Sequence, residues 1–567
     1  MKRTIRSVAV LLVGTLLMTL VGCRLGWPNF SKSKGKSASS HTASSAVSTA
    51  SAASSAAAAT VFSLPMALGR DMNPLKTDSM TNLTLWPLLF DSLAEPDSGY
   101  STQWCLASSA DISGSTVTVH LRSGVHFTDG TALTAKDVLY SYNAVRGDSA
   151  SFFYANTTNI ANITSSGNYT VIFTLKSPDA LFANLLNIPI IKSGSDTTAT
   201  AVGSSPCPIG SGRYSYSDNA LNGTLTVNKS WYKGTAPTIQ TIRLINMLDS
   251  SVTLSSLKTG VINYLYADWN GATVATAGLQ TASVGLNRMV FLGVNWSNSF
   301  LANAHVRRAV SMAIDRSSIV SEAFSSRAKA SLLPFNPDWA ELVKLNTAAS
   351  GPSAASTASS ASSASSKTAR SSSSKTASGA SAASVDSDTA NTTVDRADVT
   401  NELTAAGLPA KSGSSATLLT LRLLVDSGNT QMMTAAKKIV SSLSPSGIAV
   451  TIDAEPASAY ASKLSAGQYD LYLGEIRLTD DMDISPLFQG GTAGFGAPAT
   501  SQTQTAFTGW RAGSVTLSSL ADTFRTEEPF IPLCFRLGTV AYSTGLKGTV
   551  APTYADIFQN AEGWHFN

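Results

Sequence analysis

Residues 117–145 read VTVHLRSGVHFTDGTALTAKDVLYSYNAV. Apolar and polar side chains alternate over Thr116–Leu121, as they do in a half-buried strand. The dipeptide Asp129-Gly130 is typical of a tight turn. Thr134 follows, and an acidic residue three positions later stands where a helix capping box has Glu or Gln. The stretch predicts a strand, a turn and a helix, whose apolar residues at helical spacing are Val138, Leu139, Tyr142 and Val145.

The rest of the chain also alternates between strand-like and helix-like patterns. Leu419–Val425 and Ile448–Ile452 are apolar runs of strand length. Apolar residues at helical spacing fill Met433–Leu443 between them, so we expect a strand–helix–strand unit with parallel strands. Helical spacing recurs over Val306–Ile314. These patterns favour mixed α/β lobes.

Several segments carry a resemblance to a known family. Residues 117–145 resemble the signature LRxGVxFxDGxxLTAxDV of the peptide/nickel family of ABC-importer solute-binding proteins. Further segments that resemble the family, in its order, are Asp71–Leu75, Leu88–Leu93, Ile209–Tyr214, Asn228–Gly234, Leu257–Asn263, Val306–Asp315, Tyr469–Asp470 and Ile531–Leu533. The chain departs from the family pattern at Arg213, where Pro is usual, and at Asn263, which replaces an acid. Apart from a Ser/Ala-rich insertion, the resemblance covers essentially residues 61–567.

The resemblance implies an α/β fold of the two-lobed, periplasmic-binding-protein-like type (class II). The first lobe is expected to be discontinuous, at residues 61–103, 193–270 and 512–567, with an extra subdomain inserted at 104–192. The second lobe is expected at 271–511. The ligand would lie in the cleft between the lobes, and hinge closure would exclude water around it.

The N-terminal residues indicate export. Three basic residues precede the apolar run Val8–Leu20, which is too short to span a bilayer comfortably and is typical of a signal peptide at residues 1–22. Cys23 follows Leu-Val-Gly, which resembles a lipobox, so we expect a lipid on its sulfur that anchors the protein at the outer face of the plasma membrane. The alternative is an ordinary signal peptide with an incidental Cys. Residues 23–60 are rich in Ser and Ala and are expected to be a tether.

A second Ser/Ala-rich stretch lies at residues 347–393, within the expected second lobe. Such a composition cannot bury enough apolar surface to offset the entropy lost on ordering. Loop-closure entropy rises only slowly with length, so we expect a surface-loop insertion between two packed elements.

Composition limits the partners and the cross-links of the chain. The formal net charge of +4 falls to +1 without the three basic residues of the signal peptide, so binding of nucleic acid is not indicated. Beyond Cys23 the chain has Cys105, Cys207 and Cys534, an odd number with no CxxC pair, which excludes a disulfide scaffold. One disulfide, between Cys105 and Cys207, is the expectation.

The residues that follow the strand Leu471–Leu473 are the first candidates for ligand binding. Peptide binders of the resembled family commonly place a carboxylate of the second lobe against the free α-amino group of the ligand. The charged residues offered here are Glu475, Arg477, Asp480, Asp481 and Asp483. The family spacing GWxxDxxDP is not reproduced, so Asp481 and Asp483 are the leading candidates and Asp480 is a third, each able to form a charge-assisted hydrogen bond to an ammonium. A solvated acidic turn is the alternative.

Aromatic residues near the expected hinge are the second set of candidates. Tyr266 and Trp269 follow the presumed hinge crossing, and Trp296 stands at the start of the second lobe. Aromatic walls suit a binding cleft because they offer apolar area at low entropic cost. Ordinary core packing is the alternative for each of them.

Metal chemistry and catalysis are not indicated. The five histidines form no HxH or HxxxH pair, and the three acids near 480 lack the Gly and the terminal Glu of a calcium loop. The sequence has no GxSxG, HExxH or P-loop motif. We therefore expect neither a cofactor, a metal site nor an enzymatic activity.

The sequence thus predicts a monomeric extracellular lipoprotein that captures a small solute and delivers it to the permease subunits of an ABC importer. A peptide is the expected solute. A nickel chelate, an oligosaccharide or an opine are alternatives within the same class. A membrane-anchored sensory or scaffold protein with the same fold is the alternative from a different class.

Overall fold

The computed structural model describes residues 61–196, 205–218, 223–247, 250–268, 278–349, 394–409, 417–488, 490–491, 493–498 and 500–566. The predictions for the signal peptide, for Cys23 and its tether, and for Trp269 lie outside these ranges, as do residues 350–393 of the predicted insertion. Within them, no helix combines the length and the hydropathy that crossing a membrane requires.

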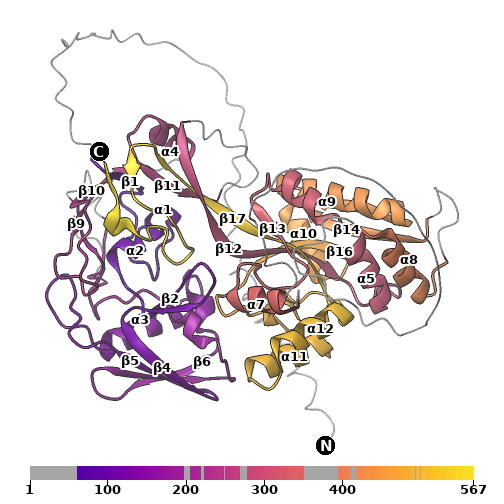
Figure 1. The fold of residues 1–567 in the computed structure, drawn as a ribbon, viewed down its shortest axis with the longest axis horizontal. Helices are drawn as coiled ribbons and strands as arrows, with labels where there is room; N and C mark the ends of the chain where they lie inside the picture. Colours follow the sequence, from indigo (N-terminus) through magenta and orange to yellow (C-terminus); the bar gives the residue numbers. More distant parts are fainter. Residues whose placement is uncertain are drawn as a thin grey trace, which may run out of the picture.

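Two bodies joined by long strands make up the described fold (Figure 1). Strands β12 (Leu279–Val294) and β17 (Ile531–Ser543) pair antiparallel and run from one body to the other. Val284 near the start of β12 packs in the core of the first lobe, whereas Val290 and Leu292 pack in the core of the second. The paired strands β12 and β17 are therefore shared by the two lobes, and bending them would move one lobe against the other.

The first lobe holds two four-stranded sheets. One has the order β1-β10-β9-β8, with β1 (Ser63–Met66), β10 (Thr241–Asn246), β9 (Gly223–Val227) and β8 (Tyr214–Asp218). The other has the order β4-β5-β7-β6, with β4 (Ala107–Ser113), β5 (Thr116–Leu121), β7 (Thr170–Leu175) and β6 (Ile160–Ser165). The remaining elements of this lobe are α1 (Met80–Leu83), α2 (Trp86–Leu89), β2 (Ala94–Pro96), β3 (Thr102–Trp104), α3 (Ala135–Arg146), α4 (Ser250–Lys258), β11 (Tyr264–Ala267), β18 (Leu546–Lys547) and β19 (His565–Phe566).

The strand, turn and helix predicted from residues 117–145 are confirmed as β5, a turn and α3. Thr134 is the N-cap of α3, and its backbone N–H donates to the Asp137 carboxylate at 2.9 Å, which completes the predicted capping box. Gly130 has φ +83°, a left-handed conformation that glycine adopts without steric cost. The Asp129 side chain accepts a hydrogen bond from Thr131 N at 3.0 Å, which closes the turn.

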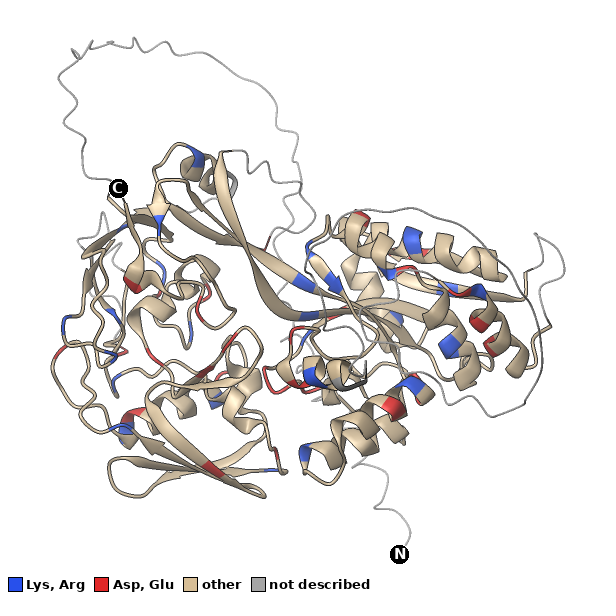
Figure 2. Ribbon diagram, viewed as in Figure 1, with Lys and Arg blue, Asp and Glu red and all other residues tan. Residues whose placement is uncertain are grey.

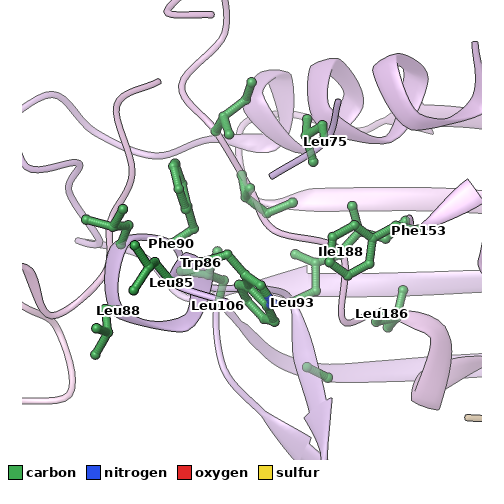
Figure 3. Close-up of a cluster of buried hydrophobic side chains, with 14 of the residues drawn as sticks. Leu75, Leu85, Trp86, Leu88, Phe90, Leu93, Leu106, Phe153, Leu186 and Ile188 are labelled. Carbon is green, nitrogen blue, oxygen red and sulfur yellow. The ribbon is translucent and has the colours of Figure 1, made fainter. Parts of the chain in front are cut away.

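Close backbone packing explains the Gly-Ser-Gly segment at residues 210–212. Figure 3 shows apolar side chains of α2 and of neighbouring segments, among them Phe153, Leu186 and Ile188, in one buried cluster. A Cβ at Gly210 would lie 2.0 Å from the carbonyl oxygen of Leu89, and one at Gly212 would lie 2.4 Å from the carbonyl carbon. Glycine is thus needed because the backbone passes directly against the end of α2.

One sheet of order β11-β17-β12-β16-β14-β15, with β13 (Ala328–Ala330) paired to β17, extends from β11 in the first lobe into the second lobe. Its other strands are β16 (Leu471–Arg477), β14 (Leu419–Asp426) and β15 (Ile448–Glu455). The predicted crossover is confirmed, because β14 and β15 are parallel and α9 (Thr430–Leu443) lies between them in sequence. The other helices of this lobe are α5 (Ala304–Ala313), α6 (Arg316–Ser318), α7 (Ala340–Ala349), α8 (Arg396–Ala405), α10 (Ala457–Ser465), α11 (Gln502–Arg511) and α12 (Leu517–Glu527).

The two faces of this sheet carry separate cores. Along β12, Val290 and Leu292 pack in the cluster that includes residues of α5, α8 and α9. Phe291 points to the opposite face and packs with Tyr472 of β16 and Phe524 of α12. Successive residues of a strand point to opposite faces, so a fully apolar run of β12 serves both cores.

The structure differs from the sequence analysis at three places. Cys105 and Cys207 are not joined, so the expected disulfide is wrong; the Cys105 sulfur is instead buried 3.7 Å from the Lys233 ammonium nitrogen. Helix α7 includes residues 347–349, so the Ser/Ala-rich insertion cannot begin before residue 350. Helix α12 packs in the second lobe, whereas the sequence analysis assigned 512–567 to the first; the return to the first lobe lies within β17.

Candidate functional site

The two lobes of the described structure contact each other directly. The turn between β2 and β3 reaches the second lobe, where Asn336 Nδ2 donates to the Tyr100 hydroxyl at 2.9 Å and Ala340 N donates to Gly99 O at 2.9 Å. Tyr100 packs in a core cluster of the second lobe although it belongs to a strand connection of the first. These contacts place side chains of the two lobes against each other, which is the arrangement expected for a closed cleft.

The acidic segment that follows β16 lies at this contact. Asp480 is almost fully buried, with 4% of its surface exposed. Its carboxylate accepts a hydrogen bond from Asn187 Nδ2 of the first lobe at 2.7 Å, and its carbonyl oxygen accepts one from Asn184 Nδ2 at 3.2 Å. Burial raises the pKa of Asp480 to about 6, and the charge of Arg477 opposes that rise.

Asp481 is held by an arginine that also binds an acid of the first lobe. The Arg511 guanidinium lies 2.6 Å from the Asp481 carboxylate and 2.5 Å from the Asp179 carboxylate. Burial, and after it the charge of Asp481, raises the pKa of Asp179 to about 7. Asp483 accepts from Ser485 N at 2.9 Å, and burial followed by the charge of Asp481 raises its pKa as well.

All three predicted acids are thus brought together where the lobes meet. Two of them, Asp480 and Asp481, are buried and already hydrogen-bonded or ion-paired to protein groups. An ammonium would have to share these carboxylates with Asn187 or Arg511, each of which already contacts one carboxylate oxygen. In this conformation the carboxylates therefore join lobe to lobe.

A row of three arginines crosses the sheet beside the acidic segment. Arg288 of β12 is directly opposite Arg477 of β16 on one side and Arg536 of β17 on the other. Directly opposite residues of antiparallel strands project from the same face, so like charges here repel unless they are compensated. Figure 2 shows basic positions on the long strands where they pass between the lobes, and an acidic loop next to them.

Two acids compensate two members of this row. Glu475 lies 3.0 Å from the Arg288 guanidinium and 3.1 Å from that of Arg536. Asp268, which follows β11, forms an ion pair with Arg536. Arg477 has no acid within ion-pair distance among the described residues, although its charge acts on Asp480.

Aromatic rings of the first lobe lie against Arg477 instead. Its guanidinium carbon is 4.1 Å from the ring centre of Phe152 and 5.4 Å from that of Tyr554. Tyr266, a predicted cleft residue, is paired with Val540 of β17. Burial raises the pKa of its hydroxyl, and the charges of Arg288 and Arg536 oppose that rise. The structure therefore brings Tyr266 to the region of the acidic segment and the arginine row.

Trp296 is placed differently from Tyr266. The Arg307 guanidinium lies 3.7 Å from its ring centre, and its indole N–H donates to Pro529 O at 3.1 Å. Trp296 packs beside the core of the second lobe. The Trp296 side chain thus makes these contacts within the second lobe.

A pocket of about 210 Å³ opens beside Arg511, at the same contact between the lobes. Its first-lobe wall is Ala180 and Leu181, and its second-lobe wall includes Trp339 and Trp510. The backbone is pinned at its edge, where Ala180 N donates to Arg511 O at 3.1 Å. The pocket is thus an apolar cavity that lies next to the ion pairs of Arg511 with Asp179 and Asp481.

Sequence reasoning did not select Arg288, Arg536, Arg511, Asp179 or the two asparagines as site residues. The arginine row depends on strand register, which pairs Arg288 with a residue 189 positions away in β16. Asp179 and Arg511 lie in segments with no motif of their own. Arg477 was noted among the charged residues after β16, yet nothing local distinguishes it from its neighbours.

Known proteins resemble this chain in sequence and in fold. The family model described as bacterial extracellular solute-binding proteins, family 5 middle, matches residues 102–494. The chain is 25% identical to the oligopeptide-binding protein AppA of Bacillus subtilis (strain 168) over 285 residues, which are 46% of this chain and 47% of AppA. The chain therefore spans about half the length of the curated relatives that it matches.

Two solved structures are similar over most of the chain. The periplasmic murein tripeptide-binding protein MppA, in its unliganded open form, has a TM-score of 0.67 and 15% identity, over 90% of this chain and 98% of MppA. NikZ from Campylobacter jejuni in complex with Ni(L-His) has a TM-score of 0.55 and 18% identity, over 89% of this chain and 99% of NikZ. At such identities the likeness concerns the fold, and it confirms the predicted two-lobed α/β class.

Proposed function

Because this chain belongs to the bacterial extracellular solute-binding proteins of family 5, we propose that it captures a peptide between its lobes and delivers it to the permease of an ABC importer. The family is the one predicted from residues 117–145 and the segments around them. A peptide is supported by relatives named for binding an oligopeptide and glutathione. The observation that carries the proposal is the meeting of polar groups from both lobes, such as Asn187 with Asp480.

The proposed mechanism is binding followed by hinge closure, with no covalent step. Strands β12 and β17 connect the lobes and would bend. In the open form the Asp179–Arg511 and Asn187–Asp480 contacts would be broken, and a ligand could enter between them. This role is that of a receptor and not of an enzyme, in keeping with relatives named as binding proteins.

We further propose that the protein acts outside the cytoplasm as a monomer anchored through lipid on Cys23. The family is described as extracellular, which supports the location. The Leu-Val-Gly-Cys sequence at the end of the apolar run supports the anchor. Anchoring the receptor at the membrane raises the effective concentration of the receptor at the permease.

Native mass spectrometry of the full chain purified from its host tests the proposal. We expect the protein to carry peptides of a narrow length range, which denaturation releases for sequencing. The same protein, freed of cargo and refolded, should gain thermal stability from a synthetic peptide mixture, because a ligand that binds only the folded state stabilises it. A protein that carries no peptide and is not stabilised by the mixture would contradict the proposal and favour a sensory or scaffold role.

A further inference from the structure

The turn between β2 and β3 crosses from the first lobe into the second. It is tight, because Tyr100 N donates to Asp97 O at 3.0 Å and Gly99 N donates to Asp97 Oδ1 at 2.8 Å. Tyr100 has φ +57°, a left-handed conformation that is uncommon for a bulky residue. Its side chain is 5% exposed and packs in the same cluster as Phe335 and Trp339 of the second lobe. A residue held in this conformation inside the other lobe points to a role in the movement of the lobes.

The Tyr100 hydroxyl begins a buried chain of hydrogen bonds. It accepts from Asn336 Nδ2 at 2.9 Å, and the same nitrogen lies 3.4 Å from Asn287 Oδ1. Asn287 Nδ2 in turn donates to the carbonyl oxygens of Leu478 at 3.2 Å and Thr479 at 3.0 Å. Both asparagines are buried. The chain therefore runs from the β2–β3 turn to the start of the acidic segment that follows β16.

Asn287 also marks the place where β12 passes from one lobe to the other. Leu286 packs in the core of the first lobe, and Met289 packs in a core cluster of the second. The pairing of β12 with β17 shifts register between Gly285 and Arg288, and Asn287 within this bulge has φ +47°. A bulge bends a strand locally, and a hinge needs a few residues that absorb a change in backbone angles. Asn287 thus lies at the point of β12 where a bend would part the lobes.

Backbone contacts hold the turn on both sides. Ala340 N, at the start of α7, donates to Gly99 O at 2.9 Å. Asn184 Nδ2 of the first lobe donates to Tyr100 O at 2.9 Å and to Asp480 O at 3.2 Å. The turn therefore also orients the first-lobe amide that contacts the acidic segment.

We infer that the β2–β3 turn is a latch, in which Tyr100 must leave the second lobe before the hinge at Asn287 bends and a captured solute escapes. Tyr100 is a positioning residue, because it acts through Asn336 on Asn287 and on the start of the acidic segment. The inference rests on the proposed function, since it concerns the release of a solute held between the lobes. The latch sets the dissociation rate, which is the rate that contacts across an interface mainly control.

Two cysteines across the contact test the latch directly. A Cβ at Gly99 would lie 3.5 Å from the Ala340 Cβ, and a disulfide joins Cβ atoms that are about 3.5–4.5 Å apart. We expect the full chain with Gly99→Cys and Ala340→Cys to form this disulfide on oxidation, seen in the intact mass as the loss of one hydrogen from each thiol. The cross-linked protein should take up no peptide from a synthetic mixture when empty and release none when loaded, and reduction should restore both.

The single variants Gly99→Cys and Ala340→Cys, oxidised in the same way, are the controls and should exchange peptide as the wild type does. A cross-linked protein that exchanges peptide at the wild-type rate would overturn the inference. Failure of the paired cysteines to cross-link would overturn it too, because the turn would then not meet α7.

Substitutions at Tyr100 show whether release depends on its side chain. Tyr100→Ala should speed the dissociation of peptide at least about tenfold, as expected for a buried aromatic residue at an interface. Tyr100→Phe keeps the ring and loses only the hydroxyl, so it should speed dissociation less. Tyr169→Ala, at an exposed tyrosine of the first lobe, should release peptide as the wild type does. Equal rates for Tyr100→Ala and the wild type would rule the latch out.

The coupling to the hinge is measured with a double variant. Asn287→Gly accepts the positive φ of this position and removes both bonds to the acidic segment. In the Asn287→Gly background, Tyr100→Phe should change the dissociation rate less than it does in the wild type, because the hydroxyl acts through the lost amide. Additive effects would show that the latch does not act through Asn287.

A wild type that binds no peptide would contradict the proposed function by itself, and the latch is then decided without a solute. Small-angle X-ray scattering compares the ligand-free proteins. Tyr100→Ala should have a larger radius of gyration than the cross-linked Gly99→Cys and Ala340→Cys variant, because its lobes part more readily. Equal radii would overturn the inference.

Discussion

At the scale of single residues, Asp480 is a carboxylate held nearly out of contact with water. Burial raises its pKa from 3.8 to about 6, so the folded chain keeps a proton that the unfolded chain releases. The contribution of Asp480 to stability therefore falls as pH rises from about 4 to about 6. Asn in its place does not titrate, and its amide oxygen can still accept from Asn187 Nδ2.

We therefore expect Asp480→Asn to gain stability relative to the wild type over that pH interval. The difference in free energy of unfolding should grow by up to roughly 3 kcal/mol between about pH 4 and pH 6.5 and then level off. Denaturant unfolding at a series of pH values measures it. Asp522→Asn, at an exposed site of α12, is the control for losing one negative charge. A difference that stays constant with pH would mean that Asp480 is not the titrating buried group.

At the scale of elements, close approach of backbones fixes the end of α2. Gly212 N donates to Leu89 O at 3.0 Å, and a Cβ at this position would lie 2.4 Å from the Leu89 carbonyl carbon. Gly212→Ala must push the two segments apart, at a cost of about 1–3 kcal/mol. We expect a lower thermal midpoint for Gly212→Ala, measured by circular dichroism. Gly563→Ala, where nothing lies within 4 Å of the added Cβ, should leave the midpoint nearly unchanged.

At the scale of elements, the parts of the fold with local sequence signals could be predicted. The β5–turn–α3 unit and the β14–α9–β15 crossover were predictable because their signals are local: alternation, a capping box and helical spacing. The family resemblance singled out the segment of Asp480 and Asp481, and the structure places both acids where the lobes meet. Their partners could not be predicted. Asn187 lies 293 residues from Asp480 and in the other lobe, so its hydrogen bond depends on how the lobes dock. Arg511 lies 30 residues from Asp481, at the end of α11, and reaches it only through the packing of the second lobe.

At the scale of the whole molecule, the closed arrangement is held by a few polar contacts rather than by a continuous apolar core. Only Tyr100 and Leu181 of the first lobe pack in or against the hydrophobic cluster of the second lobe that includes residues of α12, while Arg511 joins Asp481 of its own lobe to Asp179 of the other. Removing one partner of a buried ion pair costs about 3–5 kcal/mol. Arg511 is therefore the side chain whose loss should shift the balance between open and closed forms most directly.

We expect Arg511→Met to open the ligand-free protein, because it leaves Asp179 and Asp481 facing each other without a cation. A loss of 3–5 kcal/mol would change the equilibrium between forms by more than about a hundredfold, visible as a larger radius of gyration in small-angle X-ray scattering. Arg525→Met, which removes the ion-pair partner of the exposed Asp522 on α12, should scatter as the wild type does. The double variant Arg511→Met with Asp179→Asn should recover part of the compact form, because one of the two repelling charges is gone. A single variant as compact as the wild type would show that apolar packing across the lobes, including Tyr100 in the second-lobe core, is sufficient for closure.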